Sequence, residues 1–425
     1  MRTFLLATVA CAAVAAGHFL TNTTAADRAA PAAPAPAPVQ TPAAPTQLVA
    51  HEWGTFTSFS GSDGVPVAFT PNNTDLPAFV YFQGNPNSKA GRFNHGGLVS
   101  METPVVYFYT DRETKVSLKV DFPKGWITEW YPFAHAAPVM AKDDKPGQSI
   151  RWDVKLTPNE PAKFPRDRAE RKGDVNHYYH ARATDAVPLQ TEVAPRTPNA
   201  RGDDDDYYDD RGLRGGSVLQ REKFLFYRGV GTFPPPVTVR ALGGDKVRVV
   251  NSAGGKATGL VLVTVRGGKL GFRPVGELES GATSEAQIPP VGDQRAALGE
   301  FLVKALTAAG LYEKEATAMV KTWDSAWFGE EGTRLLYLVP RGKTDELLPL
   351  TMTPKPTELV RVLVGRHDFL TPEQEATADK EIKRLRAAQI EMNAAYAELQ
   401  KLGRFSNQAQ QLATQRLEAK SAPQK

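Results

Sequence analysis

The chain has 425 residues, with 51 Lys and Arg against 47 Asp and Glu, so its formal net charge is only +4. A balance this close to neutral gives no indication of a nucleic-acid partner. After residue 26 no run of about 18 apolar residues occurs, so no later segment is expected to span a membrane.

Residues 1–26 have the layout of a cleavable secretory signal. Arg2 provides a positive start, an apolar run extends from Phe4 to Ala16, and small residues offer cleavage after Ala16 or Ala26. The run is too short to cross a bilayer. The sequence therefore predicts export to the periplasm, the cell surface or the medium.

Cys11, the only cysteine, lies inside this apolar run, and no Leu-Ala-Gly-like triplet precedes it. Lipidation is therefore not expected, and cleavage of the signal would leave a chain without disulfides or thiol chemistry. Residues 27–47 are dominated by Ala and Pro, which favour extended backbone and bury little surface. We predict a passive linker there.

Residues 48–290 have the pattern of antiparallel β-sheet, because short β-branched and aromatic runs are separated by Gly, Pro, Asn and Asp. Gly267-Gly268 between two such runs predicts a tight hairpin, since glycine readily adopts positive φ. A sandwich or barrel is the expected class. Strands are predicted at 105–109, 116–120, 150–156, 224–228, 237–239, 247–249 and 260–265.

Two charged inserts interrupt this region, at 159–173 and 196–216, and their composition predicts long mobile loops. The second contains the acidic run 203–210, a candidate Ca²⁺ ligand set that lacks the spacing of an EF-hand loop. A solvated acidic loop is the preferred interpretation, because like charges in a row resist ordering.

Residues 291–370 change to a mixed pattern, which we interpret as a small α/β unit. Asp293 is a candidate cap for a helix that ends at Gly310, and the apolar spacing from Ala316 to Trp327 predicts a second helix. Strands are expected at 335–339 and 359–364. Structural ion pairs joining helix to sheet are expected from Glu330, Glu331, Arg334, Arg361 and Arg366.

Residues 371–425 form a predicted helical segment. Thr371 followed by Pro372 and Gln374 is a helix-start pattern, and one long helix is expected to reach Leu402 before a second begins near Ser406. Its spacing resembles a coiled-coil seam of under three heptads, so oligomerisation and packing on the body both remain open. The fold class expected is α+β: a mainly antiparallel, sandwich-like body, a small α/β unit and a C-terminal helix or helical hairpin.

The first candidate site is the pair His51-Glu52. On a strand these two side chains would point to opposite faces, with His51 as a candidate base or metal ligand and Glu52 as an acid, base or ligand. Gly54 would let another backbone or a ligand approach closely. The alternative is that Glu52 forms an ordinary ion pair.

The second candidate is Glu129, which lies in an aromatic run. Trp126 and Trp130 are expected on one strand face and Glu129 on the other. Aromatic rings beside a carboxylate suit sugar binding, so Trp53, Trp126 and Trp130 are candidate ligand-binding residues. Glu129 with Glu52 would supply the two carboxylates of a glycosidase; the alternative is that the tryptophans are core.

The third candidate is the pair His177 and His180, three positions apart, which would share a metal only on a helix or turn. A divalent metal is the one cofactor that the sequence suggests. The alternative is a polar loop edge.

Three sequence segments resemble segments of uncharacterised exported bacterial proteins. They are HEWGTFT at 51–57, METPVVYFYT at 101–110 and GTRLLYLVPR at 332–341. The resemblance covers scattered parts of residues 51–366. It implies export and no particular activity.

The leading functional prediction is an exported, non-enzymatic binding or structural protein of the cell envelope, with an envelope polysaccharide or protein as partner. The C-terminal helix is a candidate oligomerisation element. The alternative is a secreted hydrolase of glycans or peptides, with or without a metal, that uses His51 and Glu52 with Glu129 or with His177 and His180. No Gly-x-Ser-x-Gly, P-loop or dinucleotide-binding pattern occurs where it would be needed.

Overall fold

A computed structural model describes residues 47–71, 75–83, 96–138, 145–167, 176–193, 218–387 and 392–421. All of them belong to one contact unit, residues 46–425. The predicted signal, most of the predicted linker, the loop at 196–216 and the acidic run 203–210 lie outside the described residues.

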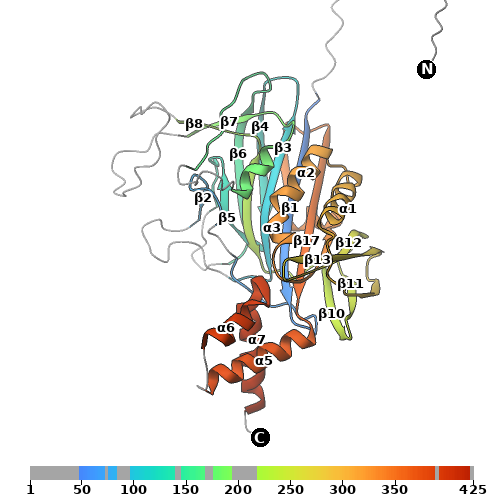
Figure 1. The fold of residues 1–425 in the computed structure, drawn as a ribbon. Coiled ribbons are helices and arrows are strands. Elements are labelled where there is room, and N and C mark those ends of the chain that lie inside the picture. Colours follow the sequence, from blue (N-terminus) through green and yellow to red (C-terminus); the bar gives the residue numbers. More distant parts are fainter. Residues whose placement is uncertain are drawn as a thin grey trace, which may run out of the picture. The chain divides into compact units, whose positions relative to one another are not determined.

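Nine strands form the central sheet, in the order β13-β12-β15-β17-β1-β3-β9-β5-β2 (Figure 1). Only β1 and β17 pair in parallel; the other neighbours are antiparallel. The strands are β1 (Val49–Ser60), β2 (Tyr81–Phe82), β3 (Val99–Tyr109), β5 (Gly125–Tyr131), β9 (Leu225–Gly231), β12 (Ala257–Arg266), β13 (Lys269–Leu278), β15 (Gly332–Leu338) and β17 (Glu358–Phe369).

Two smaller sheets cover one face of the central sheet, which we call the sandwich face. Ala50, Phe56 and Leu363 on that face belong to one buried cluster with Leu118 and Trp152 of the five-stranded sheet. The five strands are β16 (Leu350–Thr353), β4 (Thr114–Phe122), β6 (Gln148–Leu156), β7 (Leu189–Val193) and β8 (Val218–Glu222). The three-stranded sheet contains β10 (Val237–Gly243), β11 (Lys246–Asn251) and β14 (Thr283–Gln287).

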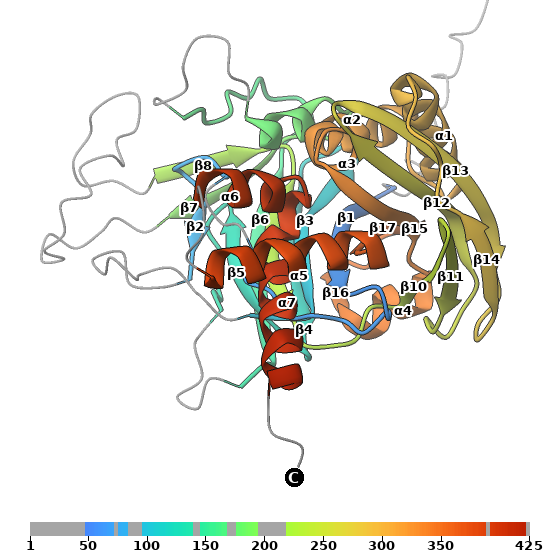
Figure 2. The ribbon, with the colours of Figure 1, turned by 60° about the horizontal axis from the view of Figure 1, so that its bottom comes forward.

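Helices cover the opposite face, which we call the helix face. Figures 1 and 2 show the helices, in a first and a C-terminal group. One buried cluster joins Trp53, Val105 and Val362 to the first group, and a second joins Phe59 to the C-terminal group. The first group is η1 (His177–Arg182), α1 (Arg295–Ala308), α2 (Glu313–Thr322) and α3 (Asp324–Phe328). The C-terminal group is α5 (Pro372–Arg386), α6 (Met392–Gln400), η2 (Gly403–Phe405) and α7 (Ser406–Ser421); α4 (Arg341–Leu347) connects β15 to β16.

The expected fold class is confirmed: a mixed α+β protein with mostly antiparallel sheets and C-terminal helices. Six of the seven strands predicted between 105 and 265 lie within observed strands, and the seventh, at 224–228, begins one residue before β9. The predicted hairpin joins β12 to β13, with positive φ at Gly267 and Gly268. Among the described residues, no helix is long and apolar enough to cross a membrane.

Within residues 291–370, β15 and β17 are part of the central sheet and β16 is part of the five-stranded sheet. β17 pairs with β1 along its whole length, and β15 pairs with both β17 and β12. The predicted second helix is divided at Trp323 into α2 and α3, and Gln294 rather than Asp293 precedes α1.

The prediction of one long helix from 371 to 402 is wrong, although its Thr371 capping box is present. α5 ends at Arg386 and α6 begins at Met392, and both helices pack together with α7. This arrangement brings Ile382 and Leu399 into one cluster with Phe59, which a straight helix could not do. In α6, Met392 and Tyr396 are exposed.

Candidate functional site

A belt of charged side chains crosses the helix face between its two apolar clusters. Strand alternation places it there: on β17, Val362 and Val364 belong to the first cluster, and Arg366 and Asp368 continue the same face. Every strand residue of the belt is at most 5% exposed. This charged belt consists of Arg334, Arg366, Asp368, Glu102, Arg404, Arg228, Glu129 and Asp75.

One end of the belt ties α3 to the sheet. Arg366 donates to Asp368 Oδ2 at 2.6 Å and to Glu330 Oε2 at 2.6 Å. Arg334 donates to the main-chain oxygens of Ala326 and Trp327 at 2.8 and 3.0 Å, so it satisfies carbonyls at the end of a helix. Burial lowers the pKa of Arg334 to about 10. The ion pairs predicted to join helix to sheet are therefore present for these residues.

Glu102 occupies the middle of the belt, on β3. Thr57 donates to its Oε2 at 3.0 Å, and Arg404 of η2 donates to both carboxylate oxygens. Burial raises the pKa of this carboxyl, but the guanidinium groups of Arg404 and Arg228 outweigh burial and hold the pKa below its usual value. A carboxylate from the sheet is thus kept ionised by a cation from the C-terminal segment.

The other end of the belt is built around Arg228. Its guanidinium makes a two-point contact with Asp75, at 2.8 and 3.2 Å, and His177 Nε2 lies 3.3 Å from Asp75 Oδ2. Burial alone would raise the pKa of Asp75. Arg228 and His177 lower this pKa by more than burial raises it, so the pKa of Asp75 is well below its ordinary value. Glu129 on β5 and Glu102 both act electrostatically on Arg228.

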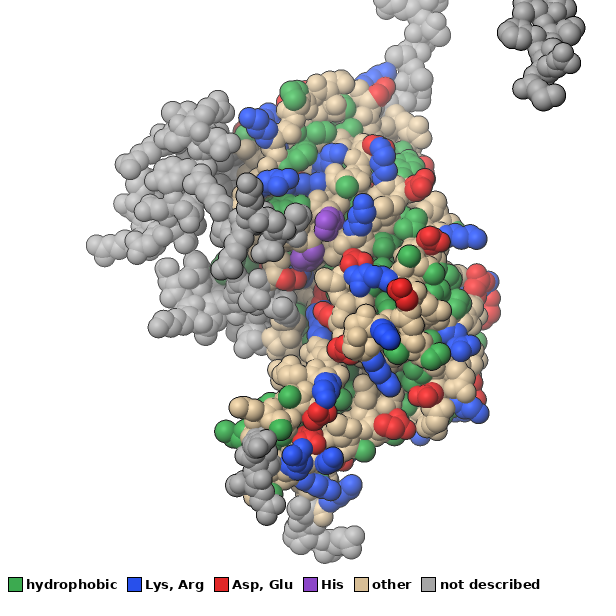
Figure 3. All heavy atoms as spheres, viewed as in Figure 1, with side chains coloured by type: hydrophobic (Ala, Val, Ile, Leu, Met, Phe, Trp, Pro, Cys, Tyr) green, Lys and Arg blue, Asp and Glu red, His purple; other side chains and the backbone are tan. Residues whose placement is uncertain are grey.

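This end of the belt reaches solvent. The Asp75 side chain is 36% exposed and that of His177 is 21% exposed, whereas Arg228 is buried. Figure 3 shows histidine side chains (purple) on this face, with charged side chains below them. A ligand therefore has access to Asp75 and His177 without unfolding the sheet.

Three buried hydroxyl groups beside Glu102 lack a hydrogen-bond partner within the described part of the chain: those of Thr55, Ser100 and Thr103. Thr55 is paired with Glu102 and Ser100 with Thr57, so Thr55 and Ser100 share the face of the belt. Thr103 has a positive φ of 48°, which is strained for a β-branched residue. Buried polar groups are normally satisfied, so these hydroxyls indicate an additional polar partner.

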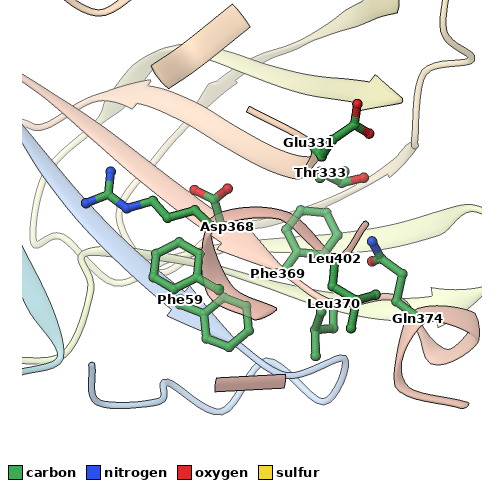
Figure 4. A pocket seen from close by; sticks show the side chains of 11 residues that line it. Phe59, Glu331, Thr333, Asp368, Phe369, Leu370, Gln374 and Leu402 are labelled. Carbon is green, nitrogen blue, oxygen red and sulfur yellow. The ribbon is translucent and has the colours of Figure 1, made fainter. Parts of the chain in front are cut away.

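A cavity of about 10 Å³ lies where the belt meets the C-terminal helices. Its lining comes from β1, β15, β17 and the C-terminal segment, and includes Phe59, Asp368 and Leu402 (Figure 4). The volume suits a single water molecule. The cavity therefore has room to solvate Asp368 but not to hold a larger ligand.

Glu52 does not join the belt. It lies on the sandwich face, where Tyr227 Oη and Arg361 Nε each donate to it at 2.5 Å, and Arg361 also bonds Asp345. Glu129 lies on the helix face, opposite Arg228. Glu52 and Glu129 are thus on opposite faces of the sheet, and the carboxylate pair expected between them does not form; Glu52 has the alternative role, a buried ion pair.

His51 lies on the helix face, as strand alternation predicted, but near the start of β1 and away from the belt. Its Nδ1 is 2.7 Å from Glu315 Oε2. Gly54 has the close backbone approach that was expected: a Cβ at this position would lie 2.8 Å from Pro104 Cα.

The tryptophans occupy different faces from those predicted. A register shift in β5 between Ile127 and Glu129 places Glu129 with Trp126 on the helix face and Trp130 in the sandwich core. Trp53, Trp126 and Trp130 are at most 7% exposed. No face of these rings is open for sugar stacking.

His177 and His180 lie on η1, a turn of the kind that a shared metal would require. His177 is instead directed to Asp75, and burial, then Lys321 and His177, lower the pKa of His180. Among the residues described, no group of three or more His, Cys, Asp or Glu side chains is arranged to hold a metal ion.

Sequence reasoning missed the belt as a site, since Glu102 and Arg404 are 302 positions apart and nothing in either segment indicates the other. No protein-family model matches the chain, and no curated protein matches it by sequence.

Proposed function

We propose that the chain is an exported, non-enzymatic binding protein of the cell envelope that holds a polar ligand on the charged belt. The observation that carries this proposal is the set of buried hydroxyls on Thr55, Ser100 and Thr103, which lack partners among the described residues. They lie next to Glu102, in a region that also contains ionised groups. A bound ligand or water would satisfy them.

Energetics also support a role beyond holding the fold together. Replacing a buried ion-pair network by apolar residues is often neutral or stabilising, and the helix face has apolar clusters on both sides of the belt. A seal between these clusters needs no charges. The presence of charges in the belt, with Asp75 and His177 exposed at one end, favours a role in recognising a ligand.

The chemistry of the belt suits a hydroxyl-rich ligand, such as a glycan of the envelope. Carboxylates accept hydrogen bonds, and hydroxyls accept or donate them; Glu129 and Glu102 both act electrostatically on Arg228, which donates to Asp75. Alternating donors and acceptors match the hydroxyl pattern of a sugar. The predicted secretory signal is consistent with an envelope partner.

Isothermal titration of the full-length chain with soluble peptidoglycan fragments and neutral oligosaccharides tests this proposal. At least one member should bind, and Asp75→Asn should weaken that binding by at least tenfold, about 1.4 kcal/mol. Asp111→Asn, at a 73% exposed carboxylate outside the belt, is the matched control and should bind like the wild type. Absence of binding to every member, or equal binding by both variants, would overturn the proposal.

A hydrolase is the second candidate function, because Glu129 and Glu102 are two carboxylates on one face of the sheet that flank Arg228 electrostatically. Paired carboxylates are the usual machinery of glycoside hydrolysis. Product release from the same oligosaccharides, lost in Glu129→Gln at unchanged thermal stability, would favour the hydrolase over the binding protein.

A further inference from the structure

The groups that carry the proposed ligand site are closed to solvent. Glu102 and Thr103 are at most 3% exposed, and Thr55 and Ser100 are fully buried. The cavity where the belt meets the C-terminal group has a volume of about 10 Å³, which is the space of one water molecule. A larger ligand can therefore reach these hydroxyls only after a covering element has moved.

An element that covers Glu102 is η2. Arg404 donates to both carboxylate oxygens of Glu102, and the ring of Phe405 packs against two rings from outside the C-terminal group. The Phe405 ring centre lies 4.6 Å from that of Phe59, in a stacked arrangement, and 5.0 Å from that of Phe69, edge to face. We call the pair Arg404 and Phe405 the latch.

The C-terminal group has a small apolar core of its own. In the cluster around the latch, Phe59, Phe69 and Leu370 are the buried members that precede α5. The members from the group itself are more numerous: Ala378, Ile382, Leu399, Leu402, Phe405, Ala409, Ala413 and Leu417. Because most of these side chains pack within the group, its helices are expected to move together rather than to unfold one by one.

Two further contacts hold the group in place, and neither involves the belt. Gly403 has a φ of 82°, and a Cβ at this position would lie 2.1 Å from the main-chain oxygen of Glu331. On α5, the Glu375 carboxylate accepts from the main-chain N–H and from the hydroxyl of Ser62, each at 2.9 Å. An interface that depends this much on polar contacts is typical of parts of a chain that move relative to one another.

Glu102 keeps cationic neighbours when Arg404 leaves. Burial raises the pKa of Glu102, and Arg404, then Arg228 and Arg366, lower it. Arg228 on β9 and Arg366 on β17 belong to the central sheet, so they stay beside Glu102 when the C-terminal group moves. The carboxylate can then remain ionised and accept a hydrogen bond from a ligand hydroxyl.

We propose that the C-terminal group is a gate over the charged belt. It moves as one body about Leu370 and Thr371, which connect β17 to α5, and its opening lets a hydroxyl-rich ligand replace Arg404 at Glu102. In the closed state the latch occupies the site as an internal substitute for the ligand. The ligand exchange rests on the proposed function, whereas the opening is a property of the chain alone.

Thiol labelling of the full-length chain measures the opening without any ligand. Cys11 is the only cysteine, so a Cys11→Ala background carries no thiol. Thr333→Cys places a probe at a 1% exposed position that lines the cavity under the gate (Figure 4). Thr344→Cys is the matched control, at a fully buried position in α4; within the described part of the chain both threonine hydroxyls lack a partner.

Iodoacetamide should label the thiol at position 333 at least about tenfold faster than the thiol at position 344, because the latter becomes accessible only by wider unfolding. Each rate is divided by the rate of the same thiol in the denatured chain. Equal corrected rates at the two positions overturn the gate.

Gly403→Ala should raise the ratio of these two rates at least about threefold, since the added methyl group pushes η2 away from Glu331 without changing a belt residue. Gly342→Ala, where nothing lies within 4 Å, should leave the ratio unchanged. If Gly403→Ala does not fold, Glu375→Gln, which weakens the contacts with Ser62, should raise the ratio instead. An unchanged ratio in the folded variant overturns the gate.

The peptidoglycan fragments and neutral oligosaccharides of the titration above test the ligand exchange. A fragment that binds should speed labelling at position 333, because it holds the gate open. Slower labelling on binding contradicts the replacement of Arg404. If no fragment binds although labelling at position 333 is fast, the proposed function fails and the opening of the C-terminal group stands.

Discussion

Glu102 shows how a single buried charge depends on a distant partner. It is 3% exposed, and Arg404 is its main cation. Removing one partner of a buried pair leaves an uncompensated charge, which costs much more than the pair itself contributes.

Arg404→Ala should therefore lower the free energy of unfolding by about 2–4 kcal/mol, somewhat less than for a fully buried pair because Arg404 is partly exposed. Arg386→Ala removes an exposed ion pair with Glu418 in the same helical group and should cost less than about 1 kcal/mol. Chemical denaturation of both variants gives the comparison. Equal losses would mean that the buried location of Glu102 is unimportant.

His367 is a second buried residue, and its contribution to stability can be measured as a dependence on pH. Its two ring nitrogens lie 2.9 Å from Ser58 Oγ and 3.0 Å from Ser60 Oγ, and burial lowers its pKa to about 4. The unfolded chain therefore binds a proton near pH 6.5, before the folded chain does. The stability contributed by neutral His367 is fully present above that pH and is lost as the pH falls toward 4.

This residue should account for a loss of about 3 kcal/mol between pH 6.5 and pH 4. In His367→Gln the unfolding free energy, measured by denaturant titration at several pH values, should be flatter over this interval. His135→Gln, at an exposed histidine, should keep the wild-type slope. A variant at position 367 with an unchanged slope would contradict the assignment.

At the scale of elements, the sequence pattern predicted those features that depend only on residues close together in the chain. The strands and the Gly267-Gly268 hairpin were predictable because alternation and turn chemistry are properties of short segments. The register shift in β5 was not, because the partner strand determines it. The division between α5 and α6 was not predicted either; the helices pack with Phe59, which lies more than 300 positions earlier in β1.

The packing between β15 and β17 can be tested by a substitution at Gly365. A Cβ at Gly365 would lie 2.0 Å from the buried ring of Tyr337 on the neighbouring strand. Gly365→Ala should thus destabilise by about 3 kcal/mol through overpacking. Gly342→Ala in α4, where nothing lies within 4 Å, should be neutral or stabilising by up to about 1 kcal/mol. Similar thermal midpoints for the two variants would contradict this packing.

At the scale of the whole molecule, the described residues form one sheet system assembled from both ends of the chain. β1 lies between β17 and β3, so the first strand is completed by a strand about 300 positions later. The charged belt has the same origin, with members from residue 75 to residue 404. Sequence reasoning could identify single candidates such as Glu129 and His177, but not their neighbours, because long-range pairing decides which side chains meet.

Residues 48–290 should consequently fail to fold alone, since β1 would lose its partner β17 and the helices α1, α2 and α3 would be absent. Residues 48–425 should unfold in a single cooperative thermal transition. Circular dichroism of both fragments provides the measurement. A cooperative transition in the shorter fragment would show that the predicted boundary at 290 separates real domains.

The claim that the charged belt holds a ligand is tested most directly by the double variant Thr55→Val, Ser100→Ala, studied by thermal unfolding with and without a ligand identified by titration. If the hydroxyls face a ligand, the free variant should be as stable as the wild type or more so, because unpaired buried hydroxyls cost free energy, and the rise in Tm caused by the ligand should be lost. A free variant that is less stable than the wild type, with the ligand-induced rise in Tm intact, would contradict the account.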